Sequence, residues 1–230
     1  MSKIPYVFLW SPKYEIFAKV LKAGIRTYDG LEDKSVFIPQ EIFDANSYKS
    51  PGHLMCGCPL KLQLTYDMLM NLPLNSYFIF SDADILIFPQ KPLMELLNIY
   101  IKLEADAVFM RETMDKRFYN VGFSLLRVNE LNRKLFVDAL KMYETEPDGL
   151  DGTFVNTCLK SYKGSCFFFP PELVATTCTV KELDAQATNM GLMRSKLIVF
   201  QALCDADKKS EDAIKQKLEQ YQILGVPVKI

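Results

Sequence analysis

The chain has 230 residues, of which 49% are hydrophobic and 24% are charged, and its formal net charge is −1 at pH 7. This is the composition of an ordinary globular protein that can bury a substantial core, and it lacks the overall basic charge typical of nucleic-acid-binding proteins. No apolar run approaches the roughly 18 residues of a membrane span, and the first run, Ile4–Trp10, is too short for a signal-peptide core, so we expect a soluble, cytoplasmic protein.

Strand-like and helix-like patterns alternate along the first hundred residues. Short β-branched and aromatic runs predict strands, and apolar residues spaced three and four apart predict helices. Glu15–Ala23 is a helix of this kind, and Gly24 is expected to end it. In chain order we expect strands at 4–10, 35–39, 77–80 and 85–88, and helices at 15–23, 60–72 and from Pro92. The polar segment Asp44–Pro59 is expected to be a loop that covers the functional site.

The later part of the chain is more mixed. We expect strands at 107–110, 121–126, 165–169 and 197–200, a helix at 130–143 capped by Asn129, and a last helix capped by Ser210. Alternating strands and helices indicate an α/β protein with a Rossmann-like, mainly parallel sheet flanked by helices. The sequence contains no internal repeat or linker, so a single domain is predicted. The six cysteines lie mostly in apolar runs, as reduced core thiols do.

The segment Tyr77–Pro89, YFIFSDADILIFP, places two aspartates between two apolar runs. Burying uncompensated carboxylates costs several kcal/mol or more each. Asp82 and Asp84 are two residues apart, so in an extended segment both side chains point to the same side. Two hard carboxylate oxygens in this arrangement can share one divalent cation. The segment therefore predicts a metal site at the end of a strand, where open α/β sheets bind ligands.

Other chemically distinctive patches surround this D-x-D motif. They are FLWSPKY at residues 8–14, Lys61 on the helix before the D-x-D strand, Tyr119-Asn120-Val121-Gly122-Phe123, and Asp151-Gly152-Thr153-Phe154-Val155-Asn156-Thr157. With these patches the chain resembles the metal-dependent glycosyltransferases of the GT-A fold, particularly the glycogenin-like and lipopolysaccharide galactosyltransferase-like group. The resemblance covers roughly residues 4–160.

The resemblance implies a UDP- or GDP-linked sugar as donor and a bound Mn²⁺ or Mg²⁺. Asp82 and Asp84 would hold this ion on the donor diphosphate, where it would neutralise the leaving group in place of a general acid. Tyr14 would stack on the base, Lys61 would reach the phosphates, and Asn120 would lie beside the sugar. The donor-binding residues implied are Leu9, Trp10, Ser11, Tyr14, Lys61, Ser81, Asp82 and Asn120.

Two positions depart from the family pattern. Gly152 stands where the family has a Gln beneath the anomeric carbon. Asp151, beside it, is the residue we expect to be catalytic, orienting an acceptor hydroxyl or deprotonating it, although it also suits the N-cap of the following helix. Gln201 follows a late strand where the family often has a His, and its amide oxygen is the third metal ligand that we expect.

The resemblance thus predicts a transferase that moves a hexosyl or related sugar to a hydroxyl of a carbohydrate or of a protein- or lipid-linked glycan. Within one domain, residues 1–100 would bind the nucleotide sugar and residues 101–230 the acceptor. Two alternatives stay open. One is a haloacid-dehalogenase-type phosphatase, which also carries D-x-D after a hydrophobic strand. The other is a non-catalytic sugar-nucleotide-binding protein that has kept the fold.

Overall fold

The computed structural model describes residues 3–45, 58–114, 118–147, 149–180, 195–203 and 210–227. Its strands are β1 (Ile4–Trp10), β2 (Leu31–Asp33), β3 (Val36–Phe37), β4 (Tyr77–Ser81), β5 (Ile85–Ile87), β6 (Ala107–Arg111), β7 (Tyr119–Arg127), β8 (Cys166–Phe168), β9 (Val174–Thr176) and β10 (Val199–Gln201). Its helices are α1 (Glu15–Ile25), α2 (Gln40–Ala45), α3 (Cys58–Asn71), α4 (Leu93–Lys102), α5 (Glu130–Thr145), α6 (Asp151–Leu159) and α9 (Ser210–Ile223), and a short 3₁₀ helix spans Pro12–Tyr14.

The larger sheet has the strand order β2-β1-β4-β7-β6-β8, with β3 also paired to β1. Strand β1 is parallel to β2, β3 and β4, and β6 is parallel to β8. Strand β7 runs antiparallel between β4 and β6. The structure therefore confirms the predicted single α/β domain with a mixed, mainly parallel sheet.

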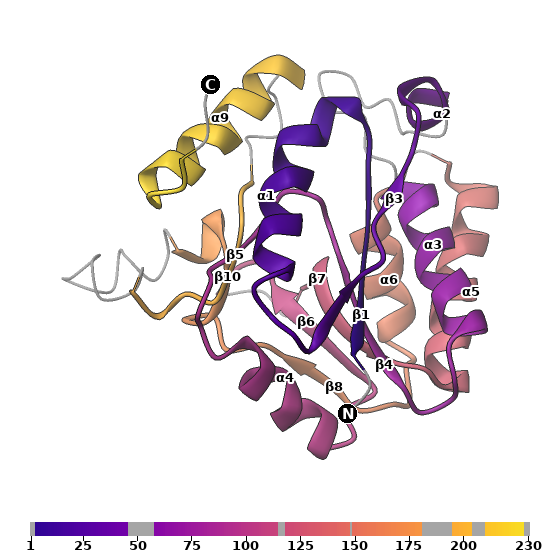
Figure 1. Cartoon of the computed structure of the whole chain (residues 1–230). Helices are drawn as coiled ribbons and strands as arrows, with labels where there is room; N and C mark the ends of the chain where they lie inside the picture. The colour runs from indigo at the N-terminus through magenta and orange to yellow at the C-terminus, as the bar shows by residue number, and fades with distance from the viewer. Residues whose placement is uncertain are drawn as a thin grey trace.

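Helices cover both faces of this sheet. Figure 1 shows α3, α5 and α6 grouped on one side, and α1 and α4 on the other. Strand β4 contributes to the cores on both faces of the sheet because successive side chains point to opposite faces. Phe78 and Phe80 pack in the core beneath α3 and α5, whereas Ile79 packs in the core beneath α1 and α4. A third apolar cluster joins α1 to α9 through the edge-to-face contact of Phe17 with Tyr221.

The chain changes sheets at the D-x-D motif. Strand β4 ends at Ser81 and β5 begins at Ile85, but β5 belongs to a second sheet of order β5-β10-β9. Strand β10 pairs antiparallel with β5, and its Gln201 lies opposite Ile85. The short link that contains Asp82 and Asp84 therefore lies at the junction of the two sheets, with β10 beside it.

Some predicted boundaries were wrong. Helix α1 continues through Gly24 to Ile25 instead of ending there. A Cβ at Gly24 would lie 3.0 Å from the carbonyl oxygen of Ile87, so this glycine allows α1 to pack closely on β5. The sequence prediction missed β2, β9 and α2, which are too short to show a clear period. Pro92 precedes α4 as its N-cap, and α3 begins at Cys58, within the segment expected to be a loop. Residues 46–57 of that expected loop lie outside the described residues.

The described cysteines form no disulfide with one another: Cys58 is buried, and Cys158, Cys166 and Cys178 are half-buried. Among the helices that the structure describes, none is both long enough and apolar enough to cross a membrane.

Candidate active site

The D-x-D link is fixed by its backbone as well as by its side chains. At the end of β4, Ser81 pairs with Phe8 of β1 and with Phe123 of β7. The N–H of Asp82 then donates to the carbonyl oxygen of Gly122 at 2.9 Å, and the Ser81 hydroxyl donates to the carbonyl oxygen of Asp82, also at 2.9 Å. These bonds hold the two aspartates at the carboxyl end of β4.

Asp82 is paired with a lysine and an amide. The ammonium of Lys61, on the first turn of α3, lies 2.8 Å from Oδ1, and Nε2 of Gln201 donates to Oδ2 at 2.9 Å. Burial acts to raise the pKa of Asp82, but the charge and the hydrogen bond of Lys61 outweigh it, and Lys217 and Gln201 act in the same direction. The net effect lowers the pKa of Asp82, so this carboxyl is held as a carboxylate.

Asp84 has a different lysine. Its Oδ2 is ion-paired with Nζ of Lys217 on α9, and its Oδ1 accepts a longer hydrogen bond of 3.4 Å from Nε2 of Gln201. The side chains of Asp84 and Lys217 are only 6% and 9% exposed. Sequence reasoning missed Lys217, although a signal existed: it lies four residues from both Ala213 and Tyr221, so it stands on the apolar stripe of α9.

Asp151 is brought to the same place by α6. It is the first residue of that helix, it is buried, and the N-cap position is occupied by Leu150, so the predicted N-cap role was wrong. Lys61 Nζ lies 2.7 Å from Oδ2 of Asp151, and the thiol of Cys58 donates to Oδ1 at 3.4 Å. The N-terminus of α6 adds a favourable positive potential. Lys61 thereby links Asp151 to the D-x-D motif.

Asn120 lies on β7 beside the D-x-D. Its Oδ1 accepts a 2.6 Å hydrogen bond from the Gly122 N–H, and its Nδ2 donates to Glu112. Glu112 is a second residue that the sequence analysis missed. Burial raises the pKa of Glu112, the hydrogen bond from Asn120 lowers it, and the charge of Asp82 raises it further, with an upward net shift. Asn120 and Glu112 together present polar groups where β6 and β7 meet.

The first loop approaches the site through Tyr14. Its ring lies 5.8 Å from that of Phe17 and 6.5 Å from that of Phe43, and Nζ of Lys217 lies 5.9 Å from its centroid. Tyr14 therefore contacts the same lysine that pairs with Asp84.

The other residues predicted beside Tyr14, at the end of β1 and just after it, are more enclosed. Leu9 and Ser11 are buried, and Trp10 is half-buried against the ring of Phe37, with the ammonium of Lys22 at 4.8 Å from the indole. Within the described part of the chain, Ser11 Oγ and Trp10 Nε1 are buried without a hydrogen-bond partner. Such groups suit a ligand that brings its own polar atoms.

The residues around the D-x-D fit a divalent cation. Among the described residues, no three or more His, Cys, Asp and Glu side chains lie together so that they could hold a metal ion by themselves. Asp82 and Asp84 nevertheless supply carboxylate oxygens, and Oε1 of Gln201 is buried with no hydrogen-bond partner in the described structure. Rotation of the Gln201 amide would turn this oxygen toward the aspartates. Three hard oxygens of this kind are the ligand type that Mg²⁺ and Mn²⁺ prefer.

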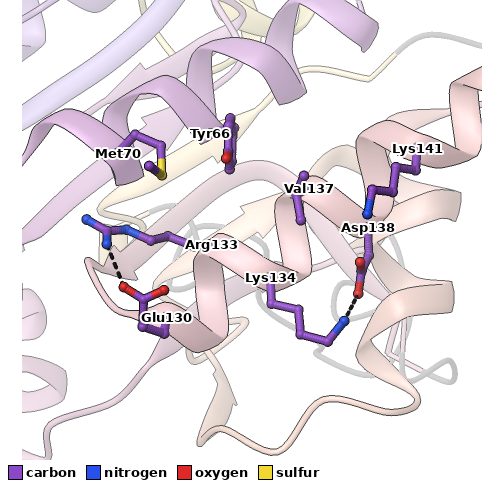
Figure 2. Close-up of a pocket in the computed structure, with 8 residues that line it drawn as sticks. All are labelled: Tyr66, Met70, Glu130, Arg133, Lys134, Val137, Asp138 and Lys141. Atoms are coloured by element: carbon purple, nitrogen blue, oxygen red, sulfur yellow. Dashed lines mark hydrogen bonds and ion pairs between the residues drawn. The ribbon is translucent and has the colours of Figure 1, made fainter.

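A shallow pocket of about 350 Å³ lies elsewhere, between α3 and α5. Figure 2 shows that ion pairs of α5, Arg133 with Glu130 and Lys134 with Asp138, run along its border. None of the predicted site residues lines it. Its lining is Tyr66, Met70, Glu130, Arg133, Lys134, Val137, Asp138 and Lys141.

Comparison with known proteins supports the fold. No family model matches the chain, and no match is found among curated proteins. Among solved structures, a glycosyltransferase involved in glycosylation of the major capsid of PBCV-1 matches with a TM-score of 0.60 at 9% identity, over 94% of this chain and 99% of that one. The galactosyltransferase LgtC, solved with donor and acceptor sugar analogues, matches with a TM-score of 0.52 at 12% identity, over 96% and 100% of the two chains.

The bifunctional glycosyltransferase WbbM matches with a TM-score of 0.59 at 13% identity. Here 96% of this chain aligns, but it spans only about half of WbbM, 51% of that chain. At such identities the likeness is one of fold. The chain has the α/β fold of these glycosyltransferases, as its sequence predicts.

Proposed function

We propose that the chain is a metal-dependent glycosyltransferase that moves a sugar from a UDP- or GDP-sugar to a hydroxyl acceptor. The observation that carries the proposal is the convergence of Asp82, Asp84, Gln201, Lys61 and Asp151 at the carboxyl end of β4. These residues come from separate parts of the chain and meet in a fold that glycosyltransferases share. Ligands bind at this edge in open α/β sheets.

The donor would lie across the D-x-D link. Asp82, Asp84 and Gln201 would hold Mn²⁺ or Mg²⁺, and this ion supplies positive charge to the diphosphate as the bond to the sugar breaks. Lys61 would contact the phosphates, since its ammonium already lies 2.8 Å from Asp82. Asn120 would bind the sugar hydroxyls because its amide both donates and accepts.

The base would bind at the first loop. In this proposal Tyr14 stacks on the base, and the backbone of Leu9, Trp10 and Ser11, together with Ser81, frames the nucleotide. Tyr14 is suited to this place because it contacts Lys217 and so lies near the D-x-D link. Residues 1–100 would thus form the donor half, and residues 101–230 the acceptor half.

Asp151 is the proposed catalytic residue. It is ion-paired with Lys61 at 2.7 Å, which would limit its ability to accept a proton. A diphosphate bound beside Asp82 offers Lys61 a more highly charged partner, so donor binding would weaken this pair. Asp151 would then be able to orient or deprotonate the hydroxyl of a carbohydrate or a protein- or lipid-linked glycan.

A thermal-shift screen of UDP- and GDP-sugars with and without Mn²⁺ tests the proposal, since a ligand that binds only the folded state raises the melting temperature. We expect at least one nucleotide sugar to raise it only with the metal, and we expect transfer or slow hydrolysis of that sugar. Asp84→Asn should lose metal-dependent donor binding. Asp151→Asn should keep donor binding but lose turnover.

Asp138→Asn is the matched control, because Asp138 is a half-buried aspartate of the α3–α5 pocket and should affect neither property. The proposal fails if no nucleotide sugar binds with any divalent ion. Turnover of an aryl phosphate without nucleotide-sugar binding would favour the phosphatase alternative. Donor binding with no transfer or hydrolysis would favour the binding-protein alternative.

A further inference from the structure

In the described structure, side chains of the protein itself balance the negative charges of the two D-x-D carboxylates. Each of the four carboxylate oxygens of Asp82 and Asp84 has an N–H neighbour: Lys61 and Gln201 on Asp82, Gln201 and Lys217 on Asp84. We propose that Lys217 occupies the cation position at Asp84, so that a divalent ion must displace it. This inference rests on the metal site of the proposed function, and on its donor only where the diphosphate is concerned.

The position of Lys217 is set by the packing of α9. Leu218 and Tyr221 of this helix are buried against Phe17 and Phe200. The backbone of α9 is therefore held in place, and the flexible side chain of Lys217 is the part that can move. Its ammonium already has a second neighbour, the ring of Tyr14 at 5.9 Å.

Electrostatic repulsion prevents the Lys217 ammonium and a divalent ion from binding to Asp84 at the same time. An ammonium and a divalent ion bound side by side on one carboxylate repel each other, and burial strengthens the repulsion because the local dielectric is low. The ion would also need the Gln201 oxygen, and the amide now presents its Nε2 to both aspartates. Metal binding therefore requires Lys217 to leave and the Gln201 amide to turn.

The displaced ammonium needs another anion, since a buried charge without a partner is costly. A diphosphate bound to the divalent ion would place such an anion beside Asp84, within reach of the Lys217 side chain. Lys217 would then contact the phosphate, and the affinities of metal and nucleotide would be coupled. Lys217 would keep the metal affinity low in the absence of nucleotide and would strengthen nucleotide binding in the presence of metal.

Titration of Mn²⁺ in the absence of nucleotide tests the exchange directly, by calorimetry or by the electron-paramagnetic-resonance signal of free Mn²⁺. Lys217→Met should bind Mn²⁺ about tenfold or more tightly than the unmodified chain, a size within the usual range of coupling between two sites. Lys215→Met is the matched control, because Lys215 is exposed two residues away on the same helix. Its affinity for Mn²⁺ should equal that of the unmodified chain.

Melting temperature is a second readout that needs no turnover. In EDTA, Lys217→Met leaves Asp84 buried without its cation, so it should melt lower than the unmodified chain. Mn²⁺ should restore most of this loss and should shift the unmodified chain much less. Lys217→Gln keeps a hydrogen-bond donor but no charge, so it should fold in EDTA and still bind Mn²⁺ more tightly.

The exchange is overturned if neither variant at position 217 binds Mn²⁺ more tightly than the unmodified chain, or if no form binds Mn²⁺ at all. Titration with UDP and GDP separates this result from the proposed function. Tighter Mn²⁺ binding by Lys217→Met with no nucleotide binding by any form would support the exchange and contradict the transferase. If nucleotides bind in a metal-dependent way but the variants at position 217 bind Mn²⁺ no more tightly than the unmodified chain, the result would support the transferase and contradict the exchange.

Discussion

Lys61 and Asp151, on α3 and α6, are ion-paired at 2.7 Å between Nζ and Oδ2. The same ammonium lies 2.8 Å from Asp82, so a single lysine balances two carboxylates from different parts of the chain. The side chains of Lys61 and Asp151 are 15% and 10% exposed, which makes the pair a partly desolvated one. Lys61 is therefore expected to matter for the stability of the fold as well as for donor binding.

Lys61→Met should lower the free energy of unfolding by roughly 3 kcal/mol, because it leaves Asp82 and Asp151 close together without their shared cation. Urea unfolding at pH 7 measures this. Lys134→Met is the control, since Lys134 is ion-paired with Asp138 on the exposed side of α5 and should show no measurable change. Equal stability of the two variants would contradict the role given to Lys61.

Gly122→Ala should disturb the site more than the fold. A Cβ at Gly122 would overlap the Gln201 amide and lie 2.8 Å from Oδ1 of Asn120. We expect a loss of roughly 1–3 kcal/mol in unfolding free energy from overpacking, and weaker metal-dependent donor binding, measured by calorimetry.

Gly152→Ala provides the comparison for this variant. The nearest atom to a Cβ at Gly152 is Cε1 of Phe118 at 3.6 Å, an ordinary contact. This variant should therefore keep the donor affinity of the unmodified chain. Weaker donor binding by Gly152→Ala than by Gly122→Ala would show that the crowding at Gln201 is unimportant.

Glu112→Gln should change the pH dependence of stability. Burial raises the pKa of Glu112 above its ordinary value of 4.5, so the folded chain binds more protons than the unfolded chain above that pH. Ionisation of Glu112 therefore costs stability as the pH rises from about 4.5 through the raised pKa. The variant should gain stability relative to the unmodified chain between pH 4 and pH 7, as followed by urea unfolding across this range. If the stability gained by the variant is the same at pH 4 as at pH 7, the raised pKa of Glu112 would be contradicted.

Tyr14→Ala should weaken nucleotide binding by about 1–3 kcal/mol if the ring stacks on the base, the usual value of such a contact. Tyr14→Phe should bind as the unmodified chain does, because it keeps the aromatic face. Trp10 is the only tryptophan in the sequence and ends β1, four residues before Tyr14, so its fluorescence can follow the titration. Equal affinities of the Ala and Phe variants would remove Tyr14 from the proposed base site.

Much of the fold was predictable because its main strands and helices are long and periodic. The strand β1 and the helices α3 and α5 follow their sequence patterns to within two residues. The predictions failed where local pattern competes with packing. Gly24 resembles a helix end, but it lies inside α1 because the helix must approach Ile87 closely.

The candidate site was predicted where a side chain carries its own signal. Asp82, Asp84 and Gln201 lie together as expected, with Lys61 and Asp151 beside them. The metal and the roles of these residues stay predictions. Lys217 and Glu112 were not found because their importance comes from partners that only the fold brings to them, Asp84 for Lys217 and the amide of Asn120 for Glu112. Nothing in the sequence beside Lys217 shows that it meets Asp84, which is 133 residues earlier.

That separation has a consequence for how the chain is made. During synthesis Asp84 emerges long before Lys217, so the two aspartates and β4 can collapse onto the core only with one carboxylate still uncompensated. Contacts between such distant residues are slow to form because the entropy of closing the loop must be lost first. The candidate site would therefore be completed late in folding, when α9 docks. A nascent chain that has not yet reached this helix would differ from the finished protein in how strongly it attracts free divalent ions.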